Sequence, residues 1–110
     1  MKISDLATLP QTSCVLPSSD PDASVDAAFT SDLLSDVMAN APENSVLLTI
    51  QAHATTVAVA IVADIKAILV CSSRAIPSDM LEAARKENVA IYLTALNQYQ
   101  ASVAISALLA

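Results

Sequence analysis

Glycine is absent from this chain of 110 residues. Glycine normally fills turns with positive φ and lets a backbone approach a phosphate group closely. Its absence therefore excludes the nucleotide-binding motifs that depend on it, the P-loop and the dinucleotide fingerprint. Turns must instead use the prolines and Asn40, Asn44 and Asn88.

Basic residues are scarce as well. Five Lys and Arg stand against eleven Asp and Glu, which gives a formal net charge of −6. Binding to a nucleic-acid backbone needs clustered cations, and we expect no nucleic-acid partner because the basic residues are scattered. They are Lys2, Lys66, Arg74, Arg85 and Lys86.

Cysteine is limited to Cys14 and Cys71, which are too few for a disulfide framework. No Cys or His lies at metal-site spacing from either, so we expect no metal and no cofactor. Free cysteine usually behaves as a small buried hydrophobe. We therefore predict that both thiols are reduced and buried.

Long apolar runs are missing too. The most apolar window, Ala54 to Ala63, is ended by Asp64 and Lys66 and is far shorter than the ~20 residues that cross a bilayer. The amino-terminal sequence MKISDLATLPQ has no apolar core of the signal-peptide kind. We expect a cytoplasmic protein with no membrane segment.

What the chain does have is apolar residues, at 55% of the total, with 15% charged and a mean hydropathy of +0.57. This leaves little polar surface for a domain of this size, so we expect a self-association surface. The length fits one domain, residues 1–110.

The stretch from Ser45 to Arg74 predicts strand, helix and strand, at Val46–Ile50, Thr55–Ala63 and Ala67–Val70. Strands that are apolar at every position are usually covered on both faces, as in a parallel sheet. We predict a single three-layer α/β domain with a mainly parallel sheet of about four or five strands flanked by helices. The other expected elements are helices at 2–9, 33–40, 77–88 and 94–110 and strands at 13–16, 25–30 and 89–93, with Ser31 and Asp32 as a helix cap.

Ligands of a parallel sheet bind at the carboxyl ends of the strands. A pair of hydroxyls, one guanidinium and the amino terminus of the helix that begins at Pro77 would form a small-anion site there. The alternative is structural: the serines cap backbone, Arg74 is solvated and His53 bonds to a loop. Nothing supports a Cys71–His53 nucleophile pair, and we expect no enzymatic activity. The candidate site residues are His53, Ser72, Ser73, Arg74 and Thr94.

Two helices are candidates for the self-association surface, although core packing is the alternative for both. One is the helix at 33–40, and the other is the carboxyl-terminal helix, with Tyr99, Val103 and Ile105 among its apolar positions. On the first helix the candidate residues are Leu33, Leu34, Val37 and Met38.

The string FTSDLLSDVMANA at residues 29–41 resembles the signature of the DRTGG domain family. The segments TIQAH, VAVAIVADIKAILV, SSRAIPSDMLEAARKENVAIYL and TALNQYQASVAIS resemble the same family in order and spacing, so that residues 2–109 are roughly covered. The family's naming motif, an aspartate, an arginine, a threonine and two glycines, would fall on residues 24–28, where none of the five is kept.

The resemblance implies a compact α/β domain similar to the amino-terminal domain of HPr kinase/phosphorylase, commonly dimeric and without established catalytic activity. Stand-alone members look like regulatory or accessory proteins, some of them encoded beside iron-only hydrogenase components. Two functions follow as hypotheses. The first is a non-catalytic regulatory or protein-interaction module that forms a homodimer, accessory to a metabolic or hydrogenase-type system, with its protein partner unidentified. The second is a sensor for a small anionic ligand, a phosphorylated metabolite or a nucleotide.

Overall fold

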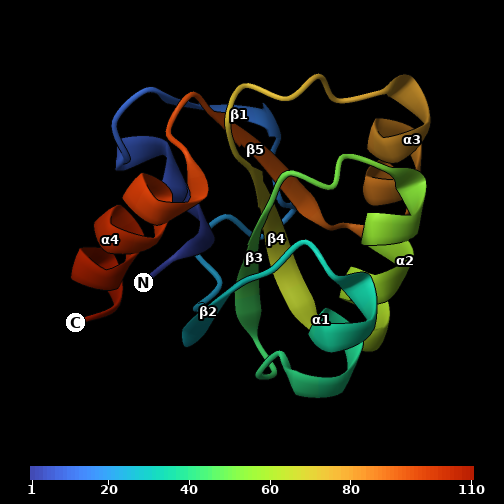
Figure 1. The fold of residues 1–110 in the computed structure, drawn as a ribbon, viewed down its shortest axis with the longest axis horizontal. Helices are drawn as coiled ribbons and strands as arrows, with labels where there is room; N and C mark the ends of the chain where they lie inside the picture. The colour runs from blue at the N-terminus through green and yellow to red at the C-terminus, as the bar shows by residue number, and fades with distance from the viewer.

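A five-stranded sheet in the order β1-β5-β4-β3-β2 runs through the middle of the computed structural model, which describes all of residues 1–110 (Figure 1). Strands β2 to β5 are parallel to one another, and β1 alone runs antiparallel, against β5. The predicted α/β class and mainly parallel sheet are confirmed. The strands are β1 (Thr12–Leu16), β2 (Ala27–Thr30), β3 (Ser45–Thr49), β4 (Ile65–Val70) and β5 (Ala90–Thr94).

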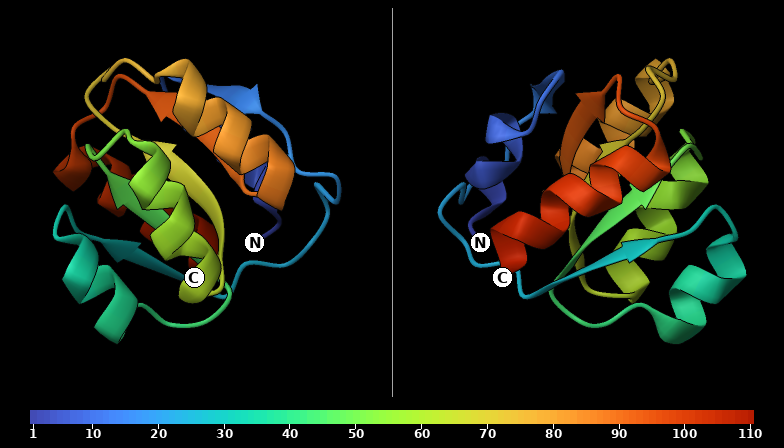
Figure 2. Two further views of the ribbon diagram at one scale, coloured as in Figure 1. Left: turned by 90° about the vertical axis from the view of Figure 1, so that its right-hand side faces the viewer. Right: turned by 60° about the vertical axis from the view of Figure 1, so that its left-hand side comes forward.

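Helices cover both faces of this sheet and make the three layers that the sequence predicts. Helices α1, α2 and α3 lie on one face, and the short 3-10 helix η1 and α4 lie on the other (Figure 1, Figure 2). The longest of them has twelve residues, and none has the length and apolar character needed to cross a bilayer. The helices are η1 (Ile3–Thr8), α1 (Leu34–Asn40), α2 (Ala54–Val62), α3 (Ser78–Glu87) and α4 (Gln98–Leu109).

The core is divided evenly by the sheet, with fourteen buried residues in the cluster on each face. All five residues of β3 are buried. Val46 and Leu48 belong to the cluster under η1 and α4, and Leu47 belongs to the cluster under α1 to α3. The strand has no polar alternation because both of its faces are covered.

Turns without glycine are built by other residues in the left-handed region. Asn44 and Asn88 take this role as predicted, and Asn88 ends α3 where glycine is usual. Asn40 does not, because it is the last residue of α1. The residues with positive φ are Gln11, Asn44, Asp64, Ser72, Ser73 and Asn88.

The prediction that both cysteines are buried is half wrong. Cys71, directly after β4, is fully buried, but Cys14 is exposed. Cys14 lies on β1, the edge strand of the sheet, where the three central residues all face solvent. Spacing in the sequence does not distinguish an edge strand from a central one, so this exposure could not be anticipated.

Candidate functional site

The carboxyl ends of the four parallel strands meet along one rim of the sheet, at Thr30, Thr49, Val70 and Thr94. In open sheets a ligand crevice forms where successive connections leave toward opposite faces. Here that point lies between β4 and β5, because α3 and α4 follow these strands on opposite faces (Figure 1).

This crevice is closed by the chain itself. The Ser72 N–H donates to the Leu96 carbonyl oxygen at 2.8 Å, and the Ser73 N–H donates to the Thr94 carbonyl oxygen at 2.9 Å. The two serines reach these positions through consecutive left-handed conformations. Their amides are therefore engaged by the neighbouring loop and are not free to bind an anion.

The Thr94 side chain is enclosed by the protein and does not face solvent. It is fully buried, and its hydroxyl oxygen accepts a hydrogen bond from the Leu96 N–H at 3.1 Å. The same hydroxyl lies 3.5 Å from the Pro10 carbonyl oxygen, which can accept its proton. Thr94, Ser72 and Ser73 therefore stabilise the rim between β4 and β5 and lie apart from the cavity described next.

His53 and Arg74 do come together, beside a cavity of about 450 Å³ between the ends of β3 and β4. The cavity has no acidic residue in its lining. The Arg74 side chain forms no ion pair, because the two ion pairs of the chain involve Lys2 and Lys66. The lining residues are Ile50, Gln51, Ala52, His53, Arg74 and Ala75.

Helix α2 begins directly at this cavity, with His53 as its N-cap residue. The His53 side chain does not cap the helix, and the first turn carries no acidic residue. The amide groups at a helix amino terminus carry partial positive charge and favour an anion. The cavity therefore combines one guanidinium, one imidazole and a helix start, of which the sequence predicted the two side chains.

Asp32 holds together the part of the rim between the ends of β2 and β3, next to the cavity. This role was not predicted from the sequence. Its Oδ1 accepts hydrogen bonds from the Thr49 hydroxyl at 3.0 Å, the Ile50 N–H at 2.9 Å and the Gln98 side-chain amide at 2.9 Å. Its carbonyl oxygen accepts one from the Gln51 side chain at 3.1 Å. One carboxylate thus joins the ends of β2 and β3 to the start of α4.

The prediction that Ser31 and Asp32 cap α1 is wrong, because the Asp32 carboxylate bonds to β3 and no side chain caps the helix. The Leu33 N–H donates to the Ser31 hydroxyl oxygen at 3.2 Å, while the Asp32 carboxylate points to β3. An aspartate before a helix usually caps it. Here the buried Thr49 hydroxyl competes for the carboxylate, and this long-range contact leaves no local pattern in the sequence.

The Cys71 thiol lies near this network but is not suited to nucleophilic chemistry. Burial raises its pKa to about 11, and the nearby Asp32 carboxylate contributes to the rise. A thiol that stays protonated at neutral pH is a weak nucleophile. Cys71 is best understood as a small core residue at the end of β4.

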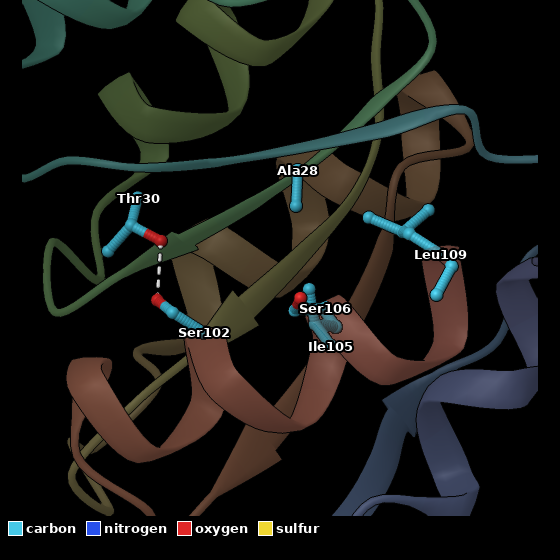
Figure 3. Close-up of a pocket in the computed structure, with 7 residues that line it drawn as sticks. Ala28, Thr30, Ser102, Ile105, Ser106 and Leu109 are labelled. Atoms are coloured by element: carbon cyan, nitrogen blue, oxygen red, sulfur yellow. Dashed lines mark hydrogen bonds between the residues drawn. The ribbon is translucent and has the colours of Figure 1, made fainter.

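A second hollow, of about 440 Å³, lies between β2 and α4 (Figure 3). The Thr30 and Ser102 hydroxyls lie 2.8 Å apart at one end of it. No charged side chain lines it, and the exposed face of α4 beside it carries Tyr99 and Val103, which are 77% and 56% exposed. The lining residues are Ala28, Thr30, Ser102, Ile105, Ser106, Leu109 and Ala110.

Only some of the residues predicted to form an interaction surface at 33–38 are exposed. Leu33 and Met38 are 64% and 51% exposed, and Leu34 is half-buried. Val37 is fully buried in the cluster under α1 to α3, so its assignment to an interaction surface is wrong. A helix of seven residues has one buried side, and Val37 lies on it.

Comparisons with known proteins show a likeness in structure. The chain matches no protein-family model and no curated protein. It is similar in structure to the CBS and DRTGG domains of the regulatory region of Clostridium perfringens pyrophosphatase, solved in complex with the activator diadenosine tetraphosphate. The TM-score is 0.74 at 12% sequence identity, over 94% of this chain and 45% of that one.

This likeness shows a shared fold, a DRTGG/CBS-like α/β domain, and the chain spans less than half the length of the solved region. It agrees with the fold that the sequence resemblance implied. Membership of the DRTGG family stays a prediction, because the identity is 12%.

Proposed function

We propose that this chain is a non-catalytic regulatory domain that acts by self-association. The observation that carries the proposal is an uneven distribution of charge. The chain has a net charge of −6, yet residues 94–110, which include all of α4, contain no charged side chain, and neither do residues 27–31 around β2. Copies of an acidic protein repel one another, and an uncharged face is where two copies approach at least electrostatic cost.

The same region exposes apolar side chains. Tyr99 and Val103 lie on the open side of α4 and are 77% and 56% exposed. Exposed apolar side chains that gather without charge are typical of protein interaction sites. The fold shared with a pyrophosphatase regulatory region supports a regulatory role.

Sedimentation equilibrium of the unmodified protein tests this proposal. We expect a dimer at micromolar concentration. Added salt should leave the dimer intact or strengthen it, because it screens repulsion between two acidic copies. A monomer throughout the micromolar range would contradict the proposal.

The cavity at His53 and Arg74 favours a second candidate function, a sensor for a small phosphorylated anion. Its support is an unpaired guanidinium beside a helix start in an otherwise acidic chain. The reported ligand of the structural neighbour, diadenosine tetraphosphate, is a phosphorylated compound and is consistent with this class. In a protein that both self-associates and binds an anion, ligand binding could regulate assembly.

Thermal denaturation with inorganic phosphate, a sugar phosphate and adenosine monophosphate tests the second candidate. A ligand at a hundred times its dissociation constant adds about 2.7 kcal/mol to the free energy of unfolding. Arg74→Ala should abolish the shift, and Lys86→Ala, which removes an exposed cation from α3, should retain it. A shift that survives Arg74→Ala, or no shift with any of the three anions, would contradict this candidate.

A further inference from the structure

The two edges of the sheet are protected to very different degrees. At one edge, β1 shifts its register against β5 between Cys14 and Leu16, and Pro10 and Pro17 lie just outside its ends. Bulges and prolines are the usual means of blocking further strand pairing. At the other edge, β2 pairs with β3 in unbroken parallel register and has the sequence AAFT, without proline or charge.

The outer edge of β2 is also open along its length. The amino-terminal segment pairs with the chain just before β2, through the isolated bridge of Lys2 with Ser24 and the bonds between Met1 and Val25, and does not continue to Ala27. Nothing follows β2 in the strand order. The backbone groups that face outward from an edge strand are a template for one more strand.

The hollow beside β2 lies next to this open edge on the α4 face. Figure 3 shows Ala28 and Thr30 from β2 on one side of it and Ser102, Ile105, Ser106 and Leu109 from α4 on the other. A strand added to β2 would therefore bring its own covering helix against α4. The required partner has an unprotected edge strand, a helix beside it and no charge on either.

A second copy of this chain meets that description, because its own β2 and α4 are the uncharged pair. We propose that two copies pair β2 with β2, antiparallel about a two-fold axis perpendicular to the sheet, to form one continuous ten-stranded sheet with the two α4 helices side by side. The inference rests on the proposed self-association and adds its geometry. Antiparallel pairing follows from this choice of axis, since a two-fold axis perpendicular to the sheet reverses the strand direction.

The symmetry also limits the register. A two-fold axis perpendicular to the sheet keeps each side chain on its own face, and side chains directly opposite one another lie on the same face. Ala28 therefore lies opposite Ala28 or Thr30 of the second copy and never opposite Phe29. Directly opposed residues have Cα atoms about 4.5 to 5.5 Å apart, within the range that a disulfide spans.

Cysteine cross-linking under mild oxidation tests the geometry, in a Cys14→Ser background that leaves only the buried Cys71. We expect a disulfide-linked dimer either from Ala28→Cys alone or from an equimolar mixture of Ala28→Cys and Thr30→Cys. The unmodified protein, whose exposed Cys14 lies on the β1 edge, is the control for random collision and should cross-link much more slowly than the β2 variants. Thermal melting before oxidation establishes that each variant is folded.

A second variant does not depend on disulfide formation. Thr30→Lys places a charge on the exposed end of β2 and should weaken self-association at least tenfold in sedimentation equilibrium. A dimer that shows no cross-link and tolerates Thr30→Lys would overturn the β2 pairing while leaving the proposed self-association intact. A cross-link through Cys14 that forms as fast as those through β2 would overturn the pairing too, and a monomer would overturn both proposals.

Discussion

The two faces of the sheet have clusters of equal size but differ in what their helices present to solvent. Each face has a cluster of fourteen buried residues, counting strand, loop and helix residues together. On the side of α1 to α3, α3 alone carries five charged residues, whereas α4 on the other side carries none. The charged residues of α3 are Asp79, Glu82, Arg85, Lys86 and Glu87.

The uncharged outer face of α4 is therefore not required for the helix to pack on the sheet. Ala101 and Ile105 bury one side of the helix against the sheet, and a solvated outer face normally carries charge. An outer face with Tyr99 and Val103 instead costs solubility and brings no benefit to the isolated domain. Helix α2 is also uncharged and exposes Ile61 and Val62, so the contrast holds against α3 alone. The partner that we propose for α4 would account for its outer face.

Matched truncations test whether the two buried clusters contribute equally to the free energy of unfolding. Met80 and Ile105 are buried on opposite faces, so Met80→Ala and Ile105→Ala should each lower the free energy of unfolding by about 2 to 5 kcal/mol. Urea denaturation at one fixed protein concentration measures both, since stability of a dimer depends on concentration. A loss below about 1 kcal/mol for either variant would mean that its layer is dispensable to the fold.

Asp32 connects the two sides of this comparison, because it bonds β3 and the start of α4 together. Asp32→Ala should cost about 2 to 3 kcal/mol, since it leaves the buried Thr49 hydroxyl and the Ile50 N–H without their acceptor.

Asp36→Ala is the matched control for Asp32. The Asp36 carboxylate accepts from the exposed Asn40 side chain on α1, so its loss should cost less than about 1 kcal/mol. The same urea measurement applies to both variants. Equal losses would contradict the role assigned to Asp32.

Alkaline pH should lower the free energy of unfolding of the domain through the cluster under η1 and α4, because Cys71 and Tyr92 are both buried in it. Burial raises the pKa of Cys71 from 9.0 to about 11. Burial, with a hydrogen bond to Cys14, raises the pKa of Tyr92 from 10.0 to about 12. The unfolded chain ionises first, so the free energy of unfolding is unaffected below about pH 9 and falls as the pH rises from 9 through 12.

The expected loss is at most roughly 3 kcal/mol per group across its range. Cys71→Ala should flatten the profile between pH 9 and 11, which unfolding free energies measured at a series of pH values would reveal. An identical profile for Cys71→Ala and the unmodified protein would contradict the assignment.

Much of the fold could be predicted because it depends on patterns along the chain. Strands β3 and β4 are apolar along most of their length, which is typical of a parallel sheet, and the structure buries them on both faces. The helix at 77–88 was marked by Pro77 at its start and Asn88 at its end, and the structure has α3 at Ser78–Glu87.

The site could be predicted only in part, because it depends on contacts between distant segments. His53 and Arg74 follow neighbouring strands and meet at one cavity. Hydrogen bonds join Ser72 and Ser73 to the loop after β5, and another joins Asp32 to β3; the bonded residues are 17 to 24 positions apart in the sequence. The exposure of Cys14 depends on which strand forms the edge of the sheet. Local patterns carry no record of such contacts.

The most direct test of the role assigned to α4 is sedimentation equilibrium of two charge-matched variants, Val103→Lys on α4 and Val62→Lys on α2. Both residues are exposed, at 56% and 69%, and each substitution adds one positive charge to the same acidic chain. We predict that Val103→Lys weakens self-association at least tenfold and that Val62→Lys leaves it unchanged. The opposite pattern, with Val62→Lys dissociating the protein and Val103→Lys silent, would contradict the account.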